Sequence, residues 1–363
     1  MTSLRTALRS GPIVARGVYE YNIASRAGPL PAREWLFPLT YRCNARCVMC
    51  NIWKADKGAE LALFDWERVL EDPLFSGIES VSLTGGEPTL RHDLPQLASL
   101  LVSHLPSLRR LTITTNALDP PRVAKACSAI ADICATRGIS FFAGISIDGV
   151  GAVHDSMRNI PGAFDRVCQT IGLLRPLSGR GLRLGANCTL TSRNLADAPN
   201  LRRWCLEQGI DANFIVASFA ESFYDNADSK SDLSFGPDQK RELVALLTDL
   251  SKGASPGNLG AYFYADAARM VEKGSPRSTP CVFQKDAFIL DARGDMQYCM
   301  YSKVLGNVTS SSAGALYYAA ENLAHRKDVI ESRCRDCTIT CFLEVGLAKD
   351  AFKYLGFLLR GLR

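Results

Sequence analysis

Three cysteines lie close together near the start of this 363-residue sequence, in the segment Cys43-Asn-Ala-Arg-Cys47-Val-Met-Cys50. Three thiolates on one short loop can hold three irons of a 4Fe–4S cluster, whereas ferredoxin-type clusters use four cysteines. No fourth cysteine lies nearby in the sequence. The spacing therefore predicts a cluster with one iron open to an external ligand, and a zinc site is the alternative.

A second group of cysteines lies towards the C-terminus. Its members are Cys281, Cys299, Cys334, Cys337 and Cys341. A predicted hairpin turn containing Gly294 precedes Cys299. Four thiolates permit a tetrahedral zinc site or an iron–sulfur cluster. We expect Cys281, Cys299, Cys334 and Cys337 to be the ligands, with Cys341 able to replace one of them; a structural zinc ribbon is the alternative.

The remaining five of the thirteen cysteines are scattered through apolar segments and are expected to be small core residues. They are Cys127, Cys134, Cys168, Cys188 and Cys205. The first ten residues lack the apolar stretch of a signal peptide, and no apolar run approaches the roughly 20 residues of a membrane span. We therefore expect a cytoplasmic protein, in which clustered cysteines bind metal or do chemistry because disulfides are rare there.

Composition narrows the function classes. Apolar residues make up 47% and charged residues 22%, which is ordinary for a globular protein with a sizeable core. The net charge is only +5, and no long basic block is interleaved with aromatics, so nucleic-acid binding is not expected. Both termini are basic: arginines 5, 9, 16 and 26 lie at one end and the amphipathic segment 348–363 at the other. We expect these ends to pack on the rest of the chain, with weak membrane-surface contact as the alternative.

Short apolar runs alternate with longer amphipathic segments between residues 35 and 216. The predicted strands are 35–41, 79–84, 108–114, 140–147, 182–189 and 212–216. The predicted helices between them are 65–70, 94–104, 121–137, 163–174 and 194–208. This alternation predicts parallel βαβ units, and hence an α/β fold with a partial (β/α)6 TIM-like barrel or an open parallel sheet. The first cysteine group then lies at the carboxyl end of a strand, where such folds place their chemistry.

Polar residues end several of these strands, on the side that carries the first cysteine group. The second strand closes on Gly85-Gly86-Glu87-Pro88, where glycines allow the backbone to approach a ligand closely and Glu87 offers an acceptor to an ammonium group. The other polar strand-end positions are Thr115, Asn116, Ser146, Asp148, Asn187 and Thr189, with Arg158 following the fourth strand. Singly, each of these residues also fits a cap or an ordinary polar strand end.

The C-x3-C-x2-C spacing after the first strand, together with Gly-Gly-Glu-Pro after the second, resembles the radical S-adenosylmethionine (SAM) superfamily. The resemblance implies that SAM chelates the open iron and that an electron cleaves it to methionine and a 5′-deoxyadenosyl radical, which takes a hydrogen atom from a substrate. It also implies that Gly85 to Pro88 hold the methionine amino group, that the polar strand ends line the SAM pocket, and that Arg158 suits the SAM carboxylate. Met49 stands where an aromatic residue is usual, with its backbone expected near the adenine.

The second cysteine group resembles the auxiliary-cluster module of SPASM and twitch radical SAM proteins. The full SPASM pattern has seven cysteines and two clusters, so the five present here imply one auxiliary 4Fe–4S cluster. Such a cluster is suited to take an electron from a product radical, which favours oxidation of the substrate. The resemblance also implies an external electron donor such as flavodoxin or ferredoxin.

The predicted organisation is an N-terminal helical extension, the barrel, linking helices, the auxiliary module and a C-terminal amphipathic helix. Their predicted ranges are 1–34, 35–236, 237–273, 274–345 and 346–363. About 34 residues precede the first strand, too few for a leader-peptide recognition domain. We therefore expect oxidation or epimerisation of a small polar molecule such as a sugar, an aminocyclitol or a nucleotide; the alternatives are a peptide maturase and a non-catalytic zinc-binding adaptor. Candidate substrate contacts are Glu221, Tyr224, Asp225, Asp286, Tyr298 and Tyr301.

Overall fold

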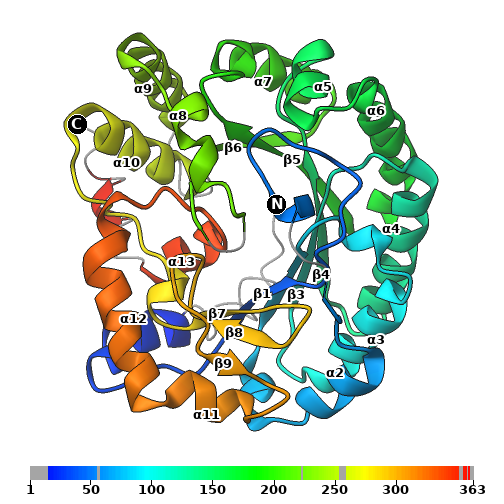
Figure 1. Cartoon of the computed structure of the whole chain (residues 1–363), viewed down its shortest axis with the longest axis vertical. Helices are drawn as coiled ribbons and strands as arrows, with labels where there is room; N and C mark the ends of the chain where they lie inside the picture. The colour runs from blue at the N-terminus through cyan, green and yellow to red at the C-terminus, as the bar shows by residue number, and fades with distance from the viewer. Residues whose placement is uncertain are drawn as a thin grey trace. The chain divides into compact units, whose positions relative to one another are not determined.

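The computed structural model describes residues 15–54, 58–221, 224–252, 259–350, 355–357 and 359. Six parallel strands form the main sheet, in the order in which they follow one another along the chain (Figure 1). They are β1 (Glu34–Pro38), β2 (Ser80–Thr84), β3 (Arg110–Thr115), β4 (Ser140–Ser146), β5 (Leu182–Leu190) and β6 (Asp211–Val216). Each predicted strand overlaps one of these, and the predicted parallel α/β fold is confirmed.

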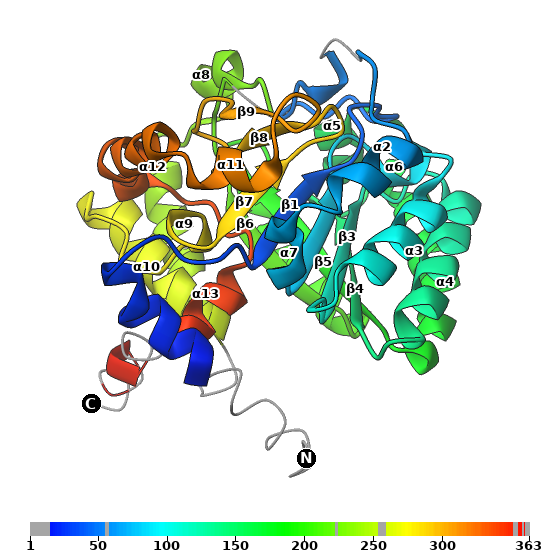
Figure 2. The same cartoon turned by 90° about the horizontal axis from the view of Figure 1, so that it is seen from below.

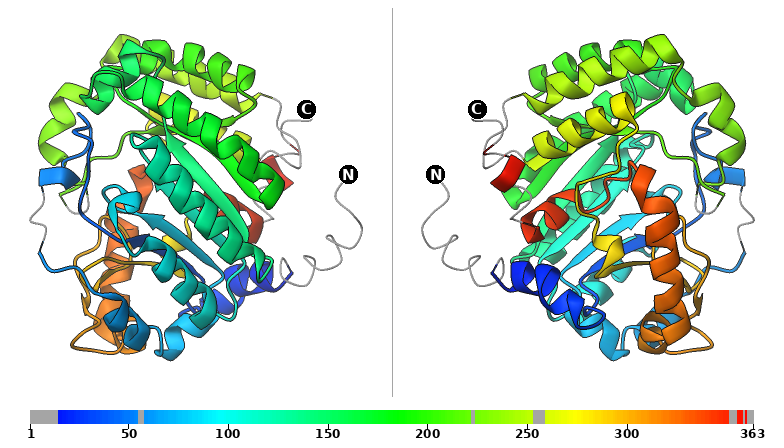
Figure 3. Two further views of the ribbon diagram at one scale, coloured as in Figure 1. Left: turned by 90° about the vertical axis from the view of Figure 1, so that its right-hand side faces the viewer. Right: turned by 90° about the vertical axis from the view of Figure 1, so that its left-hand side faces the viewer.

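Helices connect successive strands and cover the outer face of the sheet (Figures 1 and 3). They are α2 (Leu63–Val69), α3 (Leu94–His104), α4 (Pro120–Ala135), α5 (Ala152–Arg158), α6 (Ala163–Leu174) and α7 (Ala198–Glu207). In α6, Val167, Ile171 and Leu174 are buried at helical spacing, so one apolar stripe packs inward and the polar face remains outside. Short α5 was not predicted, because its seven residues offer no apolar stripe of that length.

The sheet continues beyond β1 into a distant part of the chain (Figure 2). β7 (Ala287–Leu290) pairs in parallel with β1, and β8 (Asp295–Gln297) and β9 (Gly306–Asn307) add antiparallel strands. Trp35 fixes this join: its indole Nε1 donates to the Leu290 carbonyl at 3.1 Å, and its ring stacks on Phe37 at 4.4 Å and on Phe288 at 6.1 Å. Buried aromatic contacts of this kind each contribute about 0.5–1.5 kcal/mol beyond their area.

The described chain divides into two compact units. One contains residues 32–236 and 287–325, which hold the whole sheet; the other contains residues 1–31, 237–286 and 326–363. The predicted module 274–345 is thus shared between them, because strand β7 joins the sheet through its pairing with β1. No helix of the described residues is both long enough and apolar enough to cross a membrane.

The second unit is helical in its described part. Residues 15–22 are helical, followed by α9 (Pro237–Ser251), α10 (Leu259–Lys273) and α13 (Leu343–Lys349). α11 (Ala313–Tyr318) lies in the sheet-bearing unit, and α12 (Ala320–Arg333) begins there and ends in the second. The predicted C-terminal helix 348–363 falls largely outside the described residues, as do the arginines at positions 5 and 9.

Candidate active site

The first cysteine loop begins at the end of β1 and packs tightly against the Gly-Gly-Glu-Pro turn. The amide of Gly86 donates to the Thr40 carbonyl at 2.7 Å, and the amide of Glu87 donates to the Arg42 carbonyl at 2.7 Å. A Cβ on Gly85 would lie 2.3 Å from the Thr40 oxygen, and one on Gly86 would lie 2.1 Å from the Arg42 oxygen. The glycines are therefore needed for the approach of two protein loops, which places the turn directly beside Cys43.

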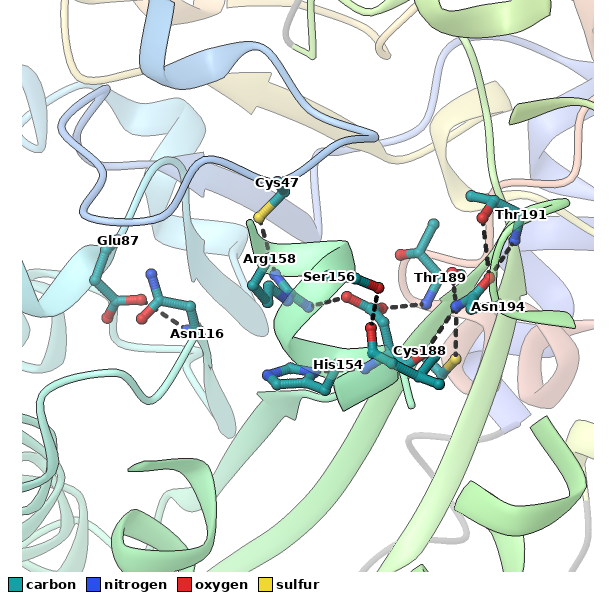
Figure 4. A network of polar contacts seen from close by, with 12 residues as sticks. Cys47, Glu87, Asn116, His154, Ser156, Arg158, Cys188, Thr189, Thr191 and Asn194 are labelled. Carbon is teal, nitrogen blue, oxygen red and sulfur yellow. Dashed lines mark hydrogen bonds and ion pairs between the residues drawn. The ribbon is translucent and has the colours of Figure 1, made fainter. Parts of the chain in front are cut away.

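The carboxylate of Glu87 is buried and ties the end of β2 to the end of β3 (Figure 4). Its Oε1 accepts from the hydroxyls of Thr89 and Thr115, both at 2.7 Å, and its Oε2 accepts from the Asn116 amide at 2.7 Å. Burial raises the pKa of Glu87, while these hydrogen bonds oppose the rise. Glu87 thus shapes the neighbourhood of the cysteine loop; its contact with the amino group of SAM stays a prediction.

Helix α5 holds the cysteine loop from the other side. The amide of Arg46 donates to the Arg158 carbonyl at 3.3 Å, and the amide of Val48 donates to the Met157 carbonyl at 3.0 Å. Asn159, with φ 53°, ends the helix in the left-handed conformation. The last carbonyls of a helix lack intrahelical partners, so the loop uses groups that α5 leaves free.

Arg158 links the cysteine loop to the ends of β4 and β5 (Figure 4). One of its terminal nitrogens donates to Cys47 Sγ at 3.4 Å, and the other lies 2.6 Å from Asp148 Oδ2. Asp148 Oδ1 accepts from the Thr189 amide at 2.9 Å. Both charged side chains are buried. The predicted positions Asp148, Arg158 and Thr189 are therefore brought together, with Arg158 contacting a cysteine sulfur through a charge-assisted hydrogen bond.

Two residues that sequence reasoning missed complete this network. Asn194 donates to the carbonyls of Asp148 and Thr189 at 2.8 and 2.9 Å, and so joins the segment just after β4 to the end of β5. His154 Nδ1 accepts from the Asp148 amide at 3.0 Å. Burial and then the charge of Arg158 lower the pKa of His154 to about 3, so this ring is neutral and carries its proton on Nε2. The sequence around these two residues carries no pattern that predicts their contacts with Asp148.

Asn116 supports the loop at Cys43. Its side-chain amide donates to Asn44 Oδ1 at 2.7 Å and lies 3.8 Å from Cys43 Sγ, a weak contact to sulfur. Two further predicted positions, Ser146 and Asn187, are paired across β4 and β5, and Asn187 Oδ1 accepts from Asn213 at 3.3 Å. The predicted strand-end residues therefore share the sheet edge that carries the cysteines.

The three sulfurs of the first group form one electrostatic neighbourhood. Burial raises the pKa of Cys43 to about 11 and that of Cys50 to about 12, and the charge of Cys47 adds to both rises. In the described part of the chain, no three His, Cys, Asp or Glu side chains converge closely enough to ligate a single metal ion. Cysteines that bind separate irons of a cluster need no such convergence. The donor set, with the Arg158 guanidinium beside Cys47, fits a cluster of net negative charge.

The loop after β6 holds the end of the cysteine loop, around Cys50. The buried Asn226 side chain donates to the Met49 carbonyl at 2.8 Å and to the Ser218 carbonyl at 3.1 Å, and it accepts from the Ala220 amide at 3.0 Å. In return, Asn51 donates its side-chain amide to the Asp225 carbonyl at 2.7 Å. The backbone around Cys50 is thereby held by a segment that also carries three of the candidate substrate contacts.

Residues 37–186 match the Radical SAM superfamily. This part of the chain is a radical SAM domain. The match begins within β1 and ends within β5, so it contains the three clustered cysteines, Gly85 to Pro88 and the Asp148–Arg158 pair. Members of this superfamily bind SAM and a 4Fe–4S cluster.

Curated relatives match about half of the chain. Pre-heme d1 synthase of Dinoroseobacter shibae is 32% identical over 193 residues, which are 53% of this chain and 44% of that protein. Fe-coproporphyrin III synthase of Methanosarcina barkeri is 29% identical over 163 residues, which are 44% of this chain and 38% of that protein. The chain therefore spans less than half the length of these two relatives.

The similarity in fold to a solved structure covers more of the chain than the similarity in sequence. The crystal structure of anSMEcpe with bound AdoMet and Cp18Cys peptide superposes with a TM-score of 0.59 over 92% of this chain and the whole of that chain, at 16% identity. At this identity the likeness concerns the fold alone. It includes the region beyond the radical SAM domain, where the second cysteine group lies.

Met49 stands at the position before the third cysteine of the loop. Its side chain is buried in a small core cluster with Met157 and Leu233. Its carbonyl is used by Asn226, as described above. The approach of its backbone to an adenine stays a prediction.

Four cysteines of the second group lie in the helical unit. Burial raises the pKa of Cys341 to about 12 and that of Cys337 to about 11, and the charge of Cys281 adds to both; Cys281 likewise raises the pKa of Cys334 after burial. Cys299 belongs to the sheet-bearing unit. Cys341, which the sequence suggested as a replacement ligand, therefore lies close enough to Cys281 and Cys337 to feel their charge.

The candidate substrate contacts fall into two kinds. Glu221 and Asp225 are exposed and Tyr224 is half-buried, in the loop after β6. Asp286 is buried and pairs with Lys349 at 2.5 Å, and the buried Tyr298 donates to the Tyr317 carbonyl at 2.5 Å. These latter two side chains have internal partners, which gives them packing roles. The half-buried Tyr301 lies near β8.

Replacing Asn226 by alanine is expected to destabilise the radical SAM domain. The Met49 and Ser218 carbonyls and the Ala220 amide would each lose a buried partner, and one such loss costs about 1–3 kcal/mol. Thermal unfolding of the variant should show a lowered midpoint. Asn200→Ala is the matched control, because Asn200 is exposed and its hydrogen bonds are to the nearby side chains of Asp197 and Arg203. Equal midpoints for the two variants would contradict the role assigned to Asn226.

Proposed function

We propose that this chain cleaves SAM reductively and uses the resulting radical to oxidise a small polar molecule. The observation that carries the proposal is the loop of Cys43, Cys47 and Cys50, which offers three thiols in one neighbourhood next to the Arg158–Asp148 pair. Three cysteine ligands leave one iron of a cluster open, which is where SAM would bind.

The chain's own residues have distinct parts in this proposal. Cys43, Cys47 and Cys50 would hold the cluster, which when bound supplies the electron that divides SAM into methionine and a 5′-deoxyadenosyl radical. Arg158 places a positive charge at Cys47, and Asp148 keeps that charge neutralised and fixed. The Gly85–Gly86 turn, which packs against residues 40–42 beside the cysteine loop, would contact the amino group of SAM.

The helical unit would hold the auxiliary cluster. Removing a hydrogen atom from the substrate accounts for one of the two electrons of an oxidation; the second electron and a proton must still leave, and the proton can pass to solvent. When bound, the auxiliary cluster supplies an acceptor for that second electron. Cys281, Cys334 and Cys337 would be ligands in this unit, and the fourth ligand would be Cys299 or Cys341.

A small substrate is favoured over a peptide. Both relatives by sequence are named as synthases of small molecules, pre-heme d1 and Fe-coproporphyrin III. The anSMEcpe structure contains a peptide, but its likeness concerns the fold only. Glu221 and Asp225, exposed after β6, would offer acceptors to hydroxyl or amino groups of such a substrate.

The test is anaerobic reconstitution with iron and sulfide, followed by incubation with SAM and dithionite alone. About eight irons per chain are expected, four for each of two clusters, together with 5′-deoxyadenosine. Bound zinc without iron, and no 5′-deoxyadenosine, would overturn the proposal.

Cys334→Ala is expected to separate the two clusters. The variant should lose about four irons, as expected for one 4Fe–4S cluster, and still form 5′-deoxyadenosine, while oxidised product no longer accumulates. Cys299→Ala and Cys341→Ala form a matched pair: the ligand's variant should lose the same irons as Cys334→Ala, and the other should keep all of them. Loss of SAM cleavage in Cys334→Ala, at wild-type occupancy of the first cluster, would contradict the separate roles assigned to the two clusters.

A further inference from the structure

Arg277 crosslinks the two segments that carry the cysteines of the helical unit. Its Nε donates to the carbonyl and the hydroxyl of Thr279, both at 3.0 Å. One terminal nitrogen donates to the carbonyls of Cys337 and Ile339 at 3.2 and 2.7 Å, and the other donates to the Pro280 carbonyl at 3.3 Å. The guanidinium is thereby fixed between the segment just before Cys281 and the loop at Cys337.

The same guanidinium is directed at a cysteine sulfur. The nitrogen that contacts the Cys337 carbonyl also lies 3.9 Å from Cys337 Sγ. Burial raises the pKa of Cys337 to about 11 and that of Cys341 to about 12, and the positive charge of Arg277 opposes both rises. It opposes the rise at Cys334 in the same way. One fixed cation thus acts on three of the sulfurs in this unit.

Arg277 has no carboxylate partner among the residues that the structure describes. Within the described part of the chain, every contact of its guanidinium is to an uncharged oxygen or to Cys337 sulfur. Arg158, beside the first cysteine group, differs in this respect, because Asp148 lies 2.6 Å from it. Arg277 is half-buried, so its charge is screened by solvent less than that of an exposed side chain and acts on nearby groups.

We propose that Arg277 sets the reduction potential of the auxiliary cluster, raising it so that the cluster accepts an electron readily. The proposal rests on the proposed function, since it presupposes a cluster on these cysteines. Potentials of iron–sulfur clusters depend on net charge and on hydrogen bonds to the sulfurs, and Arg277 supplies both. Asp148 neutralises Arg158, so Arg158 raises the potential of the first cluster less than Arg277 raises that of the second.

The experiment uses the full chain carrying Cys43→Ala, Cys47→Ala and Cys50→Ala, so that only the auxiliary cluster is present. Its midpoint potential is measured by redox titration followed by electron paramagnetic resonance, with iron content determined on the same samples. Arg277→Gln and Arg277→Lys are compared in this background. Arg335→Gln is the matched control, because Arg335 lies between Cys334 and Cys337 in the sequence but is exposed.

Arg277→Gln should keep its cluster and lower the ratio of reduced to oxidised cluster at a fixed potential about tenfold, which is 59 mV for one electron. Arg277→Lys, which keeps the charge without the planar fork, should shift less, and Arg335→Gln should shift little because solvent screens its charge. An unchanged potential in Arg277→Gln, or equal shifts in Arg277→Gln and Arg277→Lys, would overturn the proposal. So would loss of the cluster from Arg277→Gln, whether or not Arg277→Lys keeps it, since that assigns the residue to assembly. Absence of about four irons from the parent protein itself would overturn the auxiliary cluster, and the proposal with it.

Discussion

Cys50→Ala is expected to abolish the formation of 5′-deoxyadenosine from SAM. A three-cysteine site already leaves one iron without a protein ligand, and a second open iron removes the arrangement that holds the cluster in the loop. Cys50 packs against Tyr41, Ile52 and Ala292, so alanine fits its place without disturbing the fold. The measurement is 5′-deoxyadenosine after incubation with SAM and dithionite, together with iron content, which should fall by about four per chain, the content of one 4Fe–4S cluster.

Cys205→Ala is the control for this prediction. Cys205 is a free, buried cysteine of α7, and burial raises its pKa to about 11, as it raises that of Cys50. The variant therefore removes a buried thiol of similar character outside the cysteine loop. It should retain its iron and its SAM cleavage. Normal SAM cleavage by Cys50→Ala, or an equal loss of cleavage in both variants, would show that Cys50 has no specific role in holding the cluster that cleaves SAM.

The strands and their polar ends could be predicted from the sequence because each depends on local pattern. The alternation of apolar and polar residues in β3, which ends at Thr115 and is followed by Asn116, identifies both the strand and the edge of the sheet where its last residues lie. Parallel strands bring their carboxyl ends to one edge, so the predicted site residues had to meet there. The spacing of Cys43, Cys47 and Cys50 then indicated the chemistry.

The contacts that hold the cysteine loop could not be predicted, because they join segments far apart in the chain. Asn226 reaches Met49 across 177 positions, and nothing around Asn226 distinguishes it from an ordinary loop residue. The pairing of β7 with β1 depends on Trp35 reaching the Leu290 carbonyl, again a long-range contact. Helix α12 was not predicted, because its charged residues leave no continuous apolar stripe.

The two cysteine groups differ in the charge that the protein places beside them. Arg158 and Arg277 each direct a terminal nitrogen at a cysteine sulfur, at 3.4 and 3.9 Å. Only Arg158 has a carboxylate partner among the described residues. The pair at the first group fixes a guanidinium with little net charge, whereas Arg277 contributes its full charge. The stability of the first arrangement must then depend strongly on both partners being present.

Arg158→Met is therefore expected to destabilise the radical SAM domain by about 3–5 kcal/mol, because it leaves the buried carboxylate of Asp148 unpaired. Burial raises the pKa of Asp148, and Arg158 opposes the rise, so removing the arginine leaves only the hydrogen bond from the Thr189 amide to oppose it. The measurement is the free energy of unfolding in urea. Arg122→Met is the control: its pair with Asp119 at 2.9 Å is of the same type but exposed, and such pairs are worth about 0–1 kcal/mol.

Adding Asp148→Asn to Arg158→Met tests the cause. The double variant carries neither buried charge, and asparagine can still accept from the Thr189 amide, so it should be more stable than Arg158→Met alone. A favourable coupling of this kind in the double-mutant cycle would locate the loss in the unpaired carboxylate. If the double variant were no more stable than the single one, the loss would instead come from the packing of the arginine side chain and its contact with Cys47. The sign of the coupling thus decides whether Arg158 acts through its charge or through its contacts with the loop.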